Sequence, residues 1–274
     1  MNNLTLRIIS SFFLIFFFYS LLTKEILFSI SIHFLISMAL WEFLRLSNFQ
    51  IINKNLFQSS DFFLTRQRID SFDYLLIIFI NILCFFLIKK LFILFIFFTL
   101  LLLFFLFFQK VDFKKIIGIS YISSSVFFLI LLNFDKNYEK YFFVIIFYTI
   151  TTDISSYFVG KLIGGPRLAP RISPGKTISG SFGGLLIPTL LSYLIFFKYE
   201  NSFFLICFTS IVFSLIVQSG DLIESYFKRN CFVKESSNLI PGHGGVLDRF
   251  DGFLLLIFFV YILKFFNFNF FFIM

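Results

Sequence analysis

The chain has 274 residues, of which 59% are hydrophobic and only 14% are charged. This composition is too apolar for a water-soluble globular protein, and the apolar runs are too long and continuous for the alternating strands of a membrane β-barrel. The net charge of +8 comes without a basic soluble module interleaved with aromatic residues, so we expect no nucleic-acid partner.

Apolar windows of about twenty residues predict about nine transmembrane helices, and hence an all-α, polytopic integral membrane helical bundle. We expect a single membrane domain over 1–274, with N-terminal helices in 1–140 and the catalytic helices and loops in 141–274. The windows are 4–22, 25–44, 73–88, 91–108, 116–133, 141–160, 179–197, 202–220 and 252–271.

Polar segments separate these windows. The segment 45–72 mixes basic residues with Phe and Ile and is expected to be a loop on the membrane surface. Together with the N-terminus, the segments 45–72, 109–115, 161–178 and 221–251 hold sixteen of the 23 Lys and Arg residues. The positive-inside rule therefore predicts that the N-terminus and these segments are cytoplasmic.

Acidic residues gather near the predicted cytoplasmic ends of three helices. Asp221 and Glu224 are three residues apart, Asp248 and Asp251 repeat that spacing, and Asp153 lies within the sixth window. Carboxylates with this spacing share a helix face and supply the oxygen ligands that Mg²⁺ prefers. The alternative is that some of these acids form interfacial salt bridges with neighbouring Lys and Arg side chains.

Basic residues flank the acids, and several of them are explained by the positive cytoplasmic rim alone. The segment Ser173–Thr177 contains Ser, Pro, Gly and Lys in an order that favours a helix start, whose free amides attract anions. It is not a Walker A loop, because Pro170 occupies a position where that motif requires Gly. The basic residues near the acids are Arg171, Lys176, Lys228, Arg229, Lys234 and Arg249.

Two histidines and several glycines complete the candidate residues. His243 lies in a glycine-rich loop and is either a polar turn residue or an acid–base group, whereas His33 is expected to form a hydrogen bond inside the bundle. The pairs Gly160/Gly164 and Gly180/Gly184 have the spacing of tight helix contacts. Glu42, at an apolar helix end beside Trp41, is either functional or merely interfacial.

The residues from 225 to 251 resemble the signature of the phosphatidate cytidylyltransferase family. That signature runs from a Ser through Lys-Arg and Lys to apolar-Pro-x-His-Gly-Gly-apolar-x-Asp-Arg-apolar-Asp. The residues that fit it are Ser225, Phe227, Lys228, Arg229, Lys234, Ser237, Ile240, Pro241, His243, Gly244, Gly245, Val246, Asp248, Arg249, Phe250 and Asp251. Glu235 departs from it, standing where the family has Asp.

A second stretch, from 153 to 180, is similar to another segment of the family. Asp153, Tyr157, Gly160 and the run from Ser173 to Thr177 carry this likeness. Two positions depart from it, since Gly175 replaces a Lys and Ser179 replaces an acid.

The resemblance implies transfer of CMP from CTP to phosphatidic acid, giving CDP-diacylglycerol and pyrophosphate in phospholipid biosynthesis. It implies an integral protein of the cell inner or plasma membrane with its active site facing the cytoplasm. The expected partners are CTP, phosphatidic acid and membrane lipids, and a homodimer is allowed. The expected cofactor is Mg²⁺, and a second monovalent cation such as K⁺ is allowed.

The resemblance also assigns roles to particular residues. The expected metal ligands are Asp221, Asp248 and Asp251. The expected catalytic residues are Asp221, Asp248, Asp251, His243, Lys228 and Arg229. The expected substrate-binding residues are Ser173, Lys176, Thr177, Ser225, Lys234, Gly244, Gly245 and Arg249.

Two other functions stay open at this point. One is a related CTP-dependent membrane enzyme, a lipid kinase or a cytidylyltransferase that acts on another lipid. The other is an ion-coupled transporter, although its acids would be expected near the membrane midplane and its halves would be expected to repeat.

Overall fold

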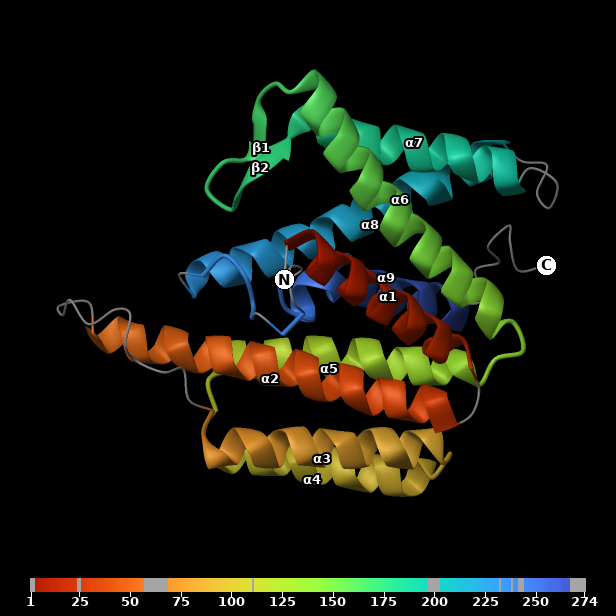
Figure 1. The fold of residues 1–274 in the computed structure, drawn as a ribbon. Helices are drawn as coiled ribbons and strands as arrows, with labels where there is room; N and C mark the ends of the chain where they lie inside the picture. The colour runs from red at the N-terminus through yellow and green to blue at the C-terminus, as the bar shows by residue number, and fades with distance from the viewer. Residues whose placement is uncertain are drawn as a thin grey trace. The chain divides into compact units, whose positions relative to one another are not determined.

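The computed structural model describes residues 3–23, 26–56, 69–109, 111–196, 203–231, 233–237, 239–240 and 244–266. Within these ranges the chain forms nine α-helices and one two-stranded antiparallel sheet (Figure 1). The helices are α1 (Asn3–Leu22), α2 (Ile26–Leu56), α3 (Ser71–Ile88), α4 (Phe92–Phe108), α5 (Phe113–Asn133), α6 (Tyr138–Ile163), α7 (Ile178–Phe196), α8 (Phe203–Asn230) and α9 (Leu247–Phe265). The strands are β1 (Arg167–Ala169) and β2 (Ser173–Thr177).

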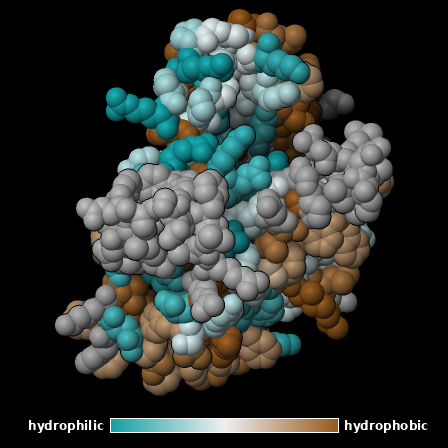
Figure 2. Space-filling model, turned by 60° about the vertical axis from the view of Figure 1, so that its left-hand side comes forward, coloured by the Kyte–Doolittle hydropathy of each residue, from teal (hydrophilic) through white to brown (hydrophobic). Residues whose placement is uncertain are grey.

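Six of the helices are long and apolar enough to cross a membrane, namely α2, α3, α5, α6, α7 and α8. Brown, hydrophobic areas lie on the face that Figure 2 shows, and many Phe, Leu and Ile side chains of the described residues are exposed. Apolar patches of this size are rare on soluble monomers, whereas lipid covers them in a membrane. The expected all-α polytopic membrane architecture is therefore confirmed, while the number of spans and the cytoplasmic N-terminus stay predictions.

The chain divides into two compact units. The first unit comprises Met1–Leu131 and Asn230–Arg249, and the second comprises Leu132–Arg229 and Phe250–Met274. The prediction of a single membrane domain stays a prediction.

In the first unit, α2 packs against both α1 and α3, and α4 packs against α3 (Figure 1). A buried polar network ties α5 to these helices: the Lys115 ammonium is 2.6 Å from Asp73 Oδ1, and Asn48 donates to Asp73 Oδ2 at 2.6 Å. Such a network stabilises a core when its charges are satisfied internally. His33 Nδ1 lies 2.9 Å from Asn81 Oδ1 between α2 and α3, which confirms the hydrogen bond predicted for His33.

In the second unit, α6 and α7 pack closely, and the β1–β2 hairpin joins them (Figure 1). A Cβ on Gly180 would lie only 2.6 Å from the carbonyl oxygen of Ser156 and 3.1 Å from the Cα of Gly160. The tight contact predicted at Gly160 and Gly180 is therefore confirmed. Gly164 is different, because it follows the last residue of α6 with a φ of 67° and has open space around it, so the predicted helix contact at this residue is wrong.

Three local expectations differ from the structure. The segment Ser173–Thr177 is a strand that pairs with β1, and the helix begins only at Ile178, so the predicted helix start within this segment is wrong. The predicted loop 45–72 is helical up to Leu56, and its residues 57–68 lie outside the described part. In addition, α8 continues ten residues beyond the apolar window and carries the acids at its end. Hydropathy marks where a helix leaves the lipid, whereas backbone hydrogen bonding decides where it ends.

Candidate active site

One face of α8 near its end carries four polar side chains. Asp221, Glu224, Ser225 and Lys228 recur at intervals of three and four residues, which brings them onto adjacent turns of one helix face. The Lys228 ammonium is 2.5 Å from Glu224 Oε2, and Ser225 Oγ donates to Asp221 Oδ1 at 3.2 Å. Glu224 therefore forms a salt bridge, which is the alternative role considered above for the acids. The second carboxylate oxygen of Asp221, Oδ2, contacts another residue.

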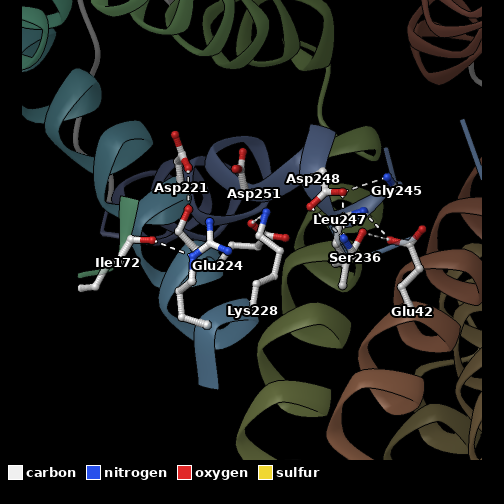
Figure 3. Close-up of polar contacts among 12 residues, drawn as sticks. Glu42, Ile172, Asp221, Glu224, Lys228, Ser236, Gly245, Leu247, Asp248 and Asp251 are labelled. Atoms are coloured by element: carbon white, nitrogen blue, oxygen red, sulfur yellow. Dashed lines mark hydrogen bonds and ion pairs between the residues drawn. The ribbon is translucent and has the colours of Figure 1, made fainter. Parts of the chain in front are cut away.

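A close contact between α8 and α9 brings Asp251 to the Asp221 end of α8. A Cβ on Gly220 would lie 2.8 Å from the carbonyl oxygen of Asp251, and a Cβ on Gly252 would lie 2.8 Å from Cγ1 of Val217. Since small residues let helix backbones approach closely in a membrane, these two glycines set the distance between the helices. Figure 3 shows the resulting neighbourhood of Asp221 and Asp251.

Negative charge concentrates around Asp251. The carboxylates of Asp221, Glu224 and Asp153 all act electrostatically on the Asp251 carboxyl group. Two cations lie among these acids, since Lys228 is paired with Glu224 and Lys176 is paired with Asp221. Like charges at such a site repel one another, and a nearby positive charge stabilises their ionised forms.

The β1–β2 hairpin brings cationic and polar groups to the same helix end. The Lys176 ammonium on β2 lies 2.5 Å from Asp221 Oδ2, and Arg229 Nε donates to the carbonyl oxygen of Ile172 at 3.0 Å. The Thr177 hydroxyl oxygen accepts the backbone N–H of Gly180 at 3.1 Å, as a helix N-cap does. Thus Lys176 faces the acidic group, Arg229 holds the hairpin to α8, and Thr177 caps α7.

The chemistry of these donors fits Mg²⁺. Magnesium commonly binds one or two carboxylates and takes its remaining ligands from water and substrate phosphates. Asp221 and Asp251 offer such a pair of carboxylates in the second unit. Among the residues that the structure describes, no three His, Cys, Asp or Glu side chains are arranged to hold a metal ion. The three-carboxylate set of Asp221, Asp248 and Asp251 therefore stays a prediction.

Asp248 is engaged by the loop that precedes α9, within the first unit. Its Oδ2 accepts the backbone N–H of Ser236 at 2.9 Å and that of Gly245 at 2.8 Å (Figure 3). Gly244 has a φ of 83°, a conformation that favours glycine, and its carbonyl oxygen accepts the N–H of Ile240 at 2.9 Å. These contacts fix the described loop residues Ser236, Ile240, Gly244 and Gly245 relative to Asp248.

The predicted site residues fall into the two units. The second unit brings together Asp221, Asp251, Lys176, Lys228, Ser225, Arg229, Thr177 and Ser173 on α8, α9 and the hairpin. The first unit holds Asp248, Gly244, Gly245, Lys234 and Arg249, of which Lys234 and Arg249 are exposed. His243 lies outside the described residues, so its role stays a prediction.

Sequence reasoning missed two glycines that shape the site. Gly220 directly precedes Asp221, and Gly252 directly follows Asp251. A glycine beside an acid on each of two neighbouring apolar helices is a signal that could have identified this contact.

Comparison with known proteins identifies the family. The model of the cytidylyltransferase family matches residues 5–266. A phosphatidate cytidylyltransferase of Bacillus subtilis (strain 168) is 40% identical over 134 residues, which cover 47% of this chain and 50% of the relative. A phosphatidate cytidylyltransferase of Staphylococcus epidermidis (strain ATCC 12228 / FDA PCI 1200) is 44% identical over 108 residues, which cover 39% of this chain and 42% of the relative. Another, of Staphylococcus haemolyticus (strain JCSC1435), is 40% identical over 123 residues, which cover 44% of this chain and 46% of the relative. The chain therefore spans about half the length of the curated relatives it matches, or somewhat less. Because the family model matches nearly the whole chain, the chain belongs to the cytidylyltransferase family.

Proposed function

We propose that this protein transfers CMP from CTP to phosphatidic acid, giving CDP-diacylglycerol and pyrophosphate. Membership of the cytidylyltransferase family supports this proposal, as do relatives that are named phosphatidate cytidylyltransferase. The proposal includes a cytoplasmic active site, which the positive-inside rule favours.

The observation that carries the proposal is the meeting of Lys176 with Asp221 beside Asp251. A cation from a polar hairpin meets two carboxylates, of which Asp221 directly follows the apolar part of α8 and Asp251 lies near the start of α9. The proposal places this cluster at the membrane surface, where the phosphate of a membrane lipid lies beside water. A nucleotide from the aqueous side and a lipid phosphate from the membrane side can both reach such a position.

The reaction needs charge compensation more than it needs a protein nucleophile. An oxygen of the lipid phosphate attacks the α-phosphorus of CTP, and the bond from this phosphorus to the bridging oxygen breaks as pyrophosphate leaves with the electron pair. Both reactants are anions, so fixed cations lower the barrier by holding the developing charge. Lys176 and Lys228 are the side chains of the second unit that we assign to this role.

Asp221 and Asp251 are the residues we assign to Mg²⁺. When bound, Mg²⁺ would supply positive charge against the phosphate oxygens of the nucleotide. The chain's own residues orient the reactants: the Gly220–Gly252 contact sets the separation of α8 and α9, and Arg229 fixes the hairpin that carries Lys176.

The test is incorporation of labelled CTP into lipid by membranes that contain this protein, with phosphatidic acid and Mg²⁺ added. We expect labelled CDP-diacylglycerol that depends on both additions and is lost with Asp221→Asn. The matched control is Asp135→Asn, which removes an acid paired with Lys264 at 2.7 Å elsewhere in the second unit and should retain activity. Absence of lipid product from folded protein would contradict the proposal, and movement of ions without product would favour a transporter.

A further inference from the structure

Glu42, on α2 of the first unit, is fully buried and accepts four hydrogen bonds. Its Oε1 accepts the backbone N–H of Val246 at 2.9 Å and the hydroxyl of Ser237, and its Oε2 accepts the N–H of Leu247 at 2.8 Å and the hydroxyl of Ser236 at 2.9 Å (Figure 3). All four donors belong to the loop before α9 or to the start of that helix. A single side chain of α2 therefore holds a segment about 200 residues away in sequence.

Four donors aimed at one side chain make Glu42 a strong hydrogen-bond acceptor. A buried carboxylate is costly unless hydrogen bonds compensate it, and bonds to a charged acceptor are stronger than neutral ones. The N–H groups of Val246 and Leu247 lie at the beginning of α9, where backbone donors have no partner within the helix and the helix dipole favours a negative charge. Glu42 thus acts as a helix cap supplied by another helix.

Gly245 and Arg45 show how closely the loop packs against the Glu42 region of α2. A Cβ on Gly245 would overlap the Ser236 hydroxyl oxygen and lie 2.5 Å from Glu42 Oε1. Arg45, one turn further along α2, donates to the carbonyl oxygen of Ser236 while its guanidinium lies 4.7 Å from the centre of the Trp41 ring. Glu42 therefore accepts hydrogen bonds from backbone amides of this segment, and Arg45 donates one to a backbone carbonyl oxygen.

This contact determines how Asp248 is presented. Gly245, whose missing side chain permits the approach to Glu42, donates its own N–H to Asp248 Oδ2 at 2.8 Å. Ser236 donates its hydroxyl to Glu42 and its backbone N–H to Asp248. Ser236 and Gly245 therefore contact both Glu42 and Asp248. A change at Glu42 that moves these two residues also moves the donors of the Asp248 carboxylate.

We propose that Glu42 is a positioning residue, which fixes the loop and the first turn of α9 so that Asp248 is held in one orientation. Glu42 itself is not a metal ligand or a proton carrier, since each of its oxygens already accepts two hydrogen bonds and neither is exposed. The effect on rate rests on the proposed function and on the predicted role of Asp248 in the site, whereas the effect on the loop rests on neither.

The variant Glu42→Gln tests this role. It keeps the shape of the side chain but places an amide NH₂ against backbone N–H donors. We expect the N–H groups of residues 244–250 to exchange hydrogen about tenfold faster in the folded protein, because those of Val246 and Leu247 lose charge-assisted bonds and no longer hold the segment in place. We also expect kcat per folded protein to fall about 100-fold, the usual effect of misplacing an active-site group by about 1 Å. Glu42→Asp, which keeps the charge but is one methylene shorter, should recover part of both.

The matched control neutralises another buried acid of the first unit. The double variant Asp73→Asn/Lys115→Met removes both partners of the α3–α5 ion pair and so leaves no unpaired charge. It should leave exchange in 244–250 and kcat per folded protein unchanged. If Glu42→Gln does not fold, Ser236→Ala/Ser237→Ala makes the same test, because it removes two of the four donors and leaves Glu42 bonded to two amides.

The outcomes are distinct. Faster exchange with lower kcat in the Glu42 variant, and neither in the control, supports the proposal. Unchanged exchange or unchanged kcat per folded protein overturns it, and so does an equal loss of kcat in the control. If the wild-type protein makes no lipid product but Glu42→Gln still accelerates exchange in 244–250, the proposed function is wrong and the hold of Glu42 on the loop stands.

Discussion

Replacing Gly220 by alanine should separate α8 from α9 and misalign the candidate active site. The new Cβ would lie 2.8 Å from the carbonyl oxygen of Asp251 and 2.9 Å from the Cα of Gly252. Carbon contacts become favourable only beyond about 3.5 Å, so the helices must part by roughly 0.6 Å. A displacement near 1 Å can cost about 100-fold in rate, and we therefore expect kcat to fall by about tenfold to 100-fold.

The assay is CDP-diacylglycerol formation by purified protein in lipid nanodiscs, normalised to the folded fraction. Overpacking of this kind costs about 1–3 kcal/mol, so most of the protein should still fold. The matched control is Ser219→Ala, one residue earlier on α8, which removes a hydroxyl that donates to the carbonyl oxygen of Ile216 in the same helix. Full activity of folded Gly220→Ala would refute the argument that this contact sets the distance between Asp221 and Asp251.

Three further predictions concern charge and burial. Lys115→Met should destabilise the protein by about 3–5 kcal/mol, because it leaves the Asp73 charge buried and unpaired. Adding Asp73→Asn should restore most of the thermal stability. Equal melting temperatures of the single variant and the wild type would contradict this prediction. Lys176→Gln should lower kcat/KM for CTP by about 100-fold, because it removes a fixed cation from the site. The melting temperature should stay unchanged, because the ion pair of Lys176 with Asp221 is partly exposed to solvent. Unchanged kcat/KM would show that Lys176 does not belong to the site. Burial raises the pKa of Cys231 to about 12, so only about one Cys231 thiol in ten thousand is ionised at pH 8. Iodoacetamide should therefore alkylate Cys231 far more slowly than a solvent-exposed thiol. Rapid labelling of Cys231 would show that this thiol is not buried.

Helix positions could be predicted because charged residues separate most of the apolar runs. The run that became α3, for example, is limited by Asp70 and Lys89, and the structure places the helix between them. The ends of α2 and α8 could not be predicted in this way, since both helices continue beyond the apolar window. The strand at Ser173–Thr177 was missed because Pro and Ser also favour helix starts, and only pairing with β1 decides between the two.

The chemistry of the site could be predicted in part. Asp221 and Lys228 were found from their place at the end of an apolar helix, and the structure gives both of them charged partners. The hold of Glu42 on Ser236 could not be predicted, because hydropathy and helical spacing carry no information about residues 194 positions apart. The same holds for Lys115 and Asp73, whose pairing depends on how two separate helices pack.

The most direct test of the central claim follows the phosphorus atoms of CTP. Purified protein is given phosphatidic acid, Mg²⁺ and CTP labelled either at the α-phosphate or at the γ-phosphate. Transfer of CMP predicts that only the α-label enters the lipid and that the γ-label leaves as pyrophosphate. Entry of the γ-label into lipid would instead show a lipid kinase, and it would contradict the account given for Lys176, Asp221 and Asp251.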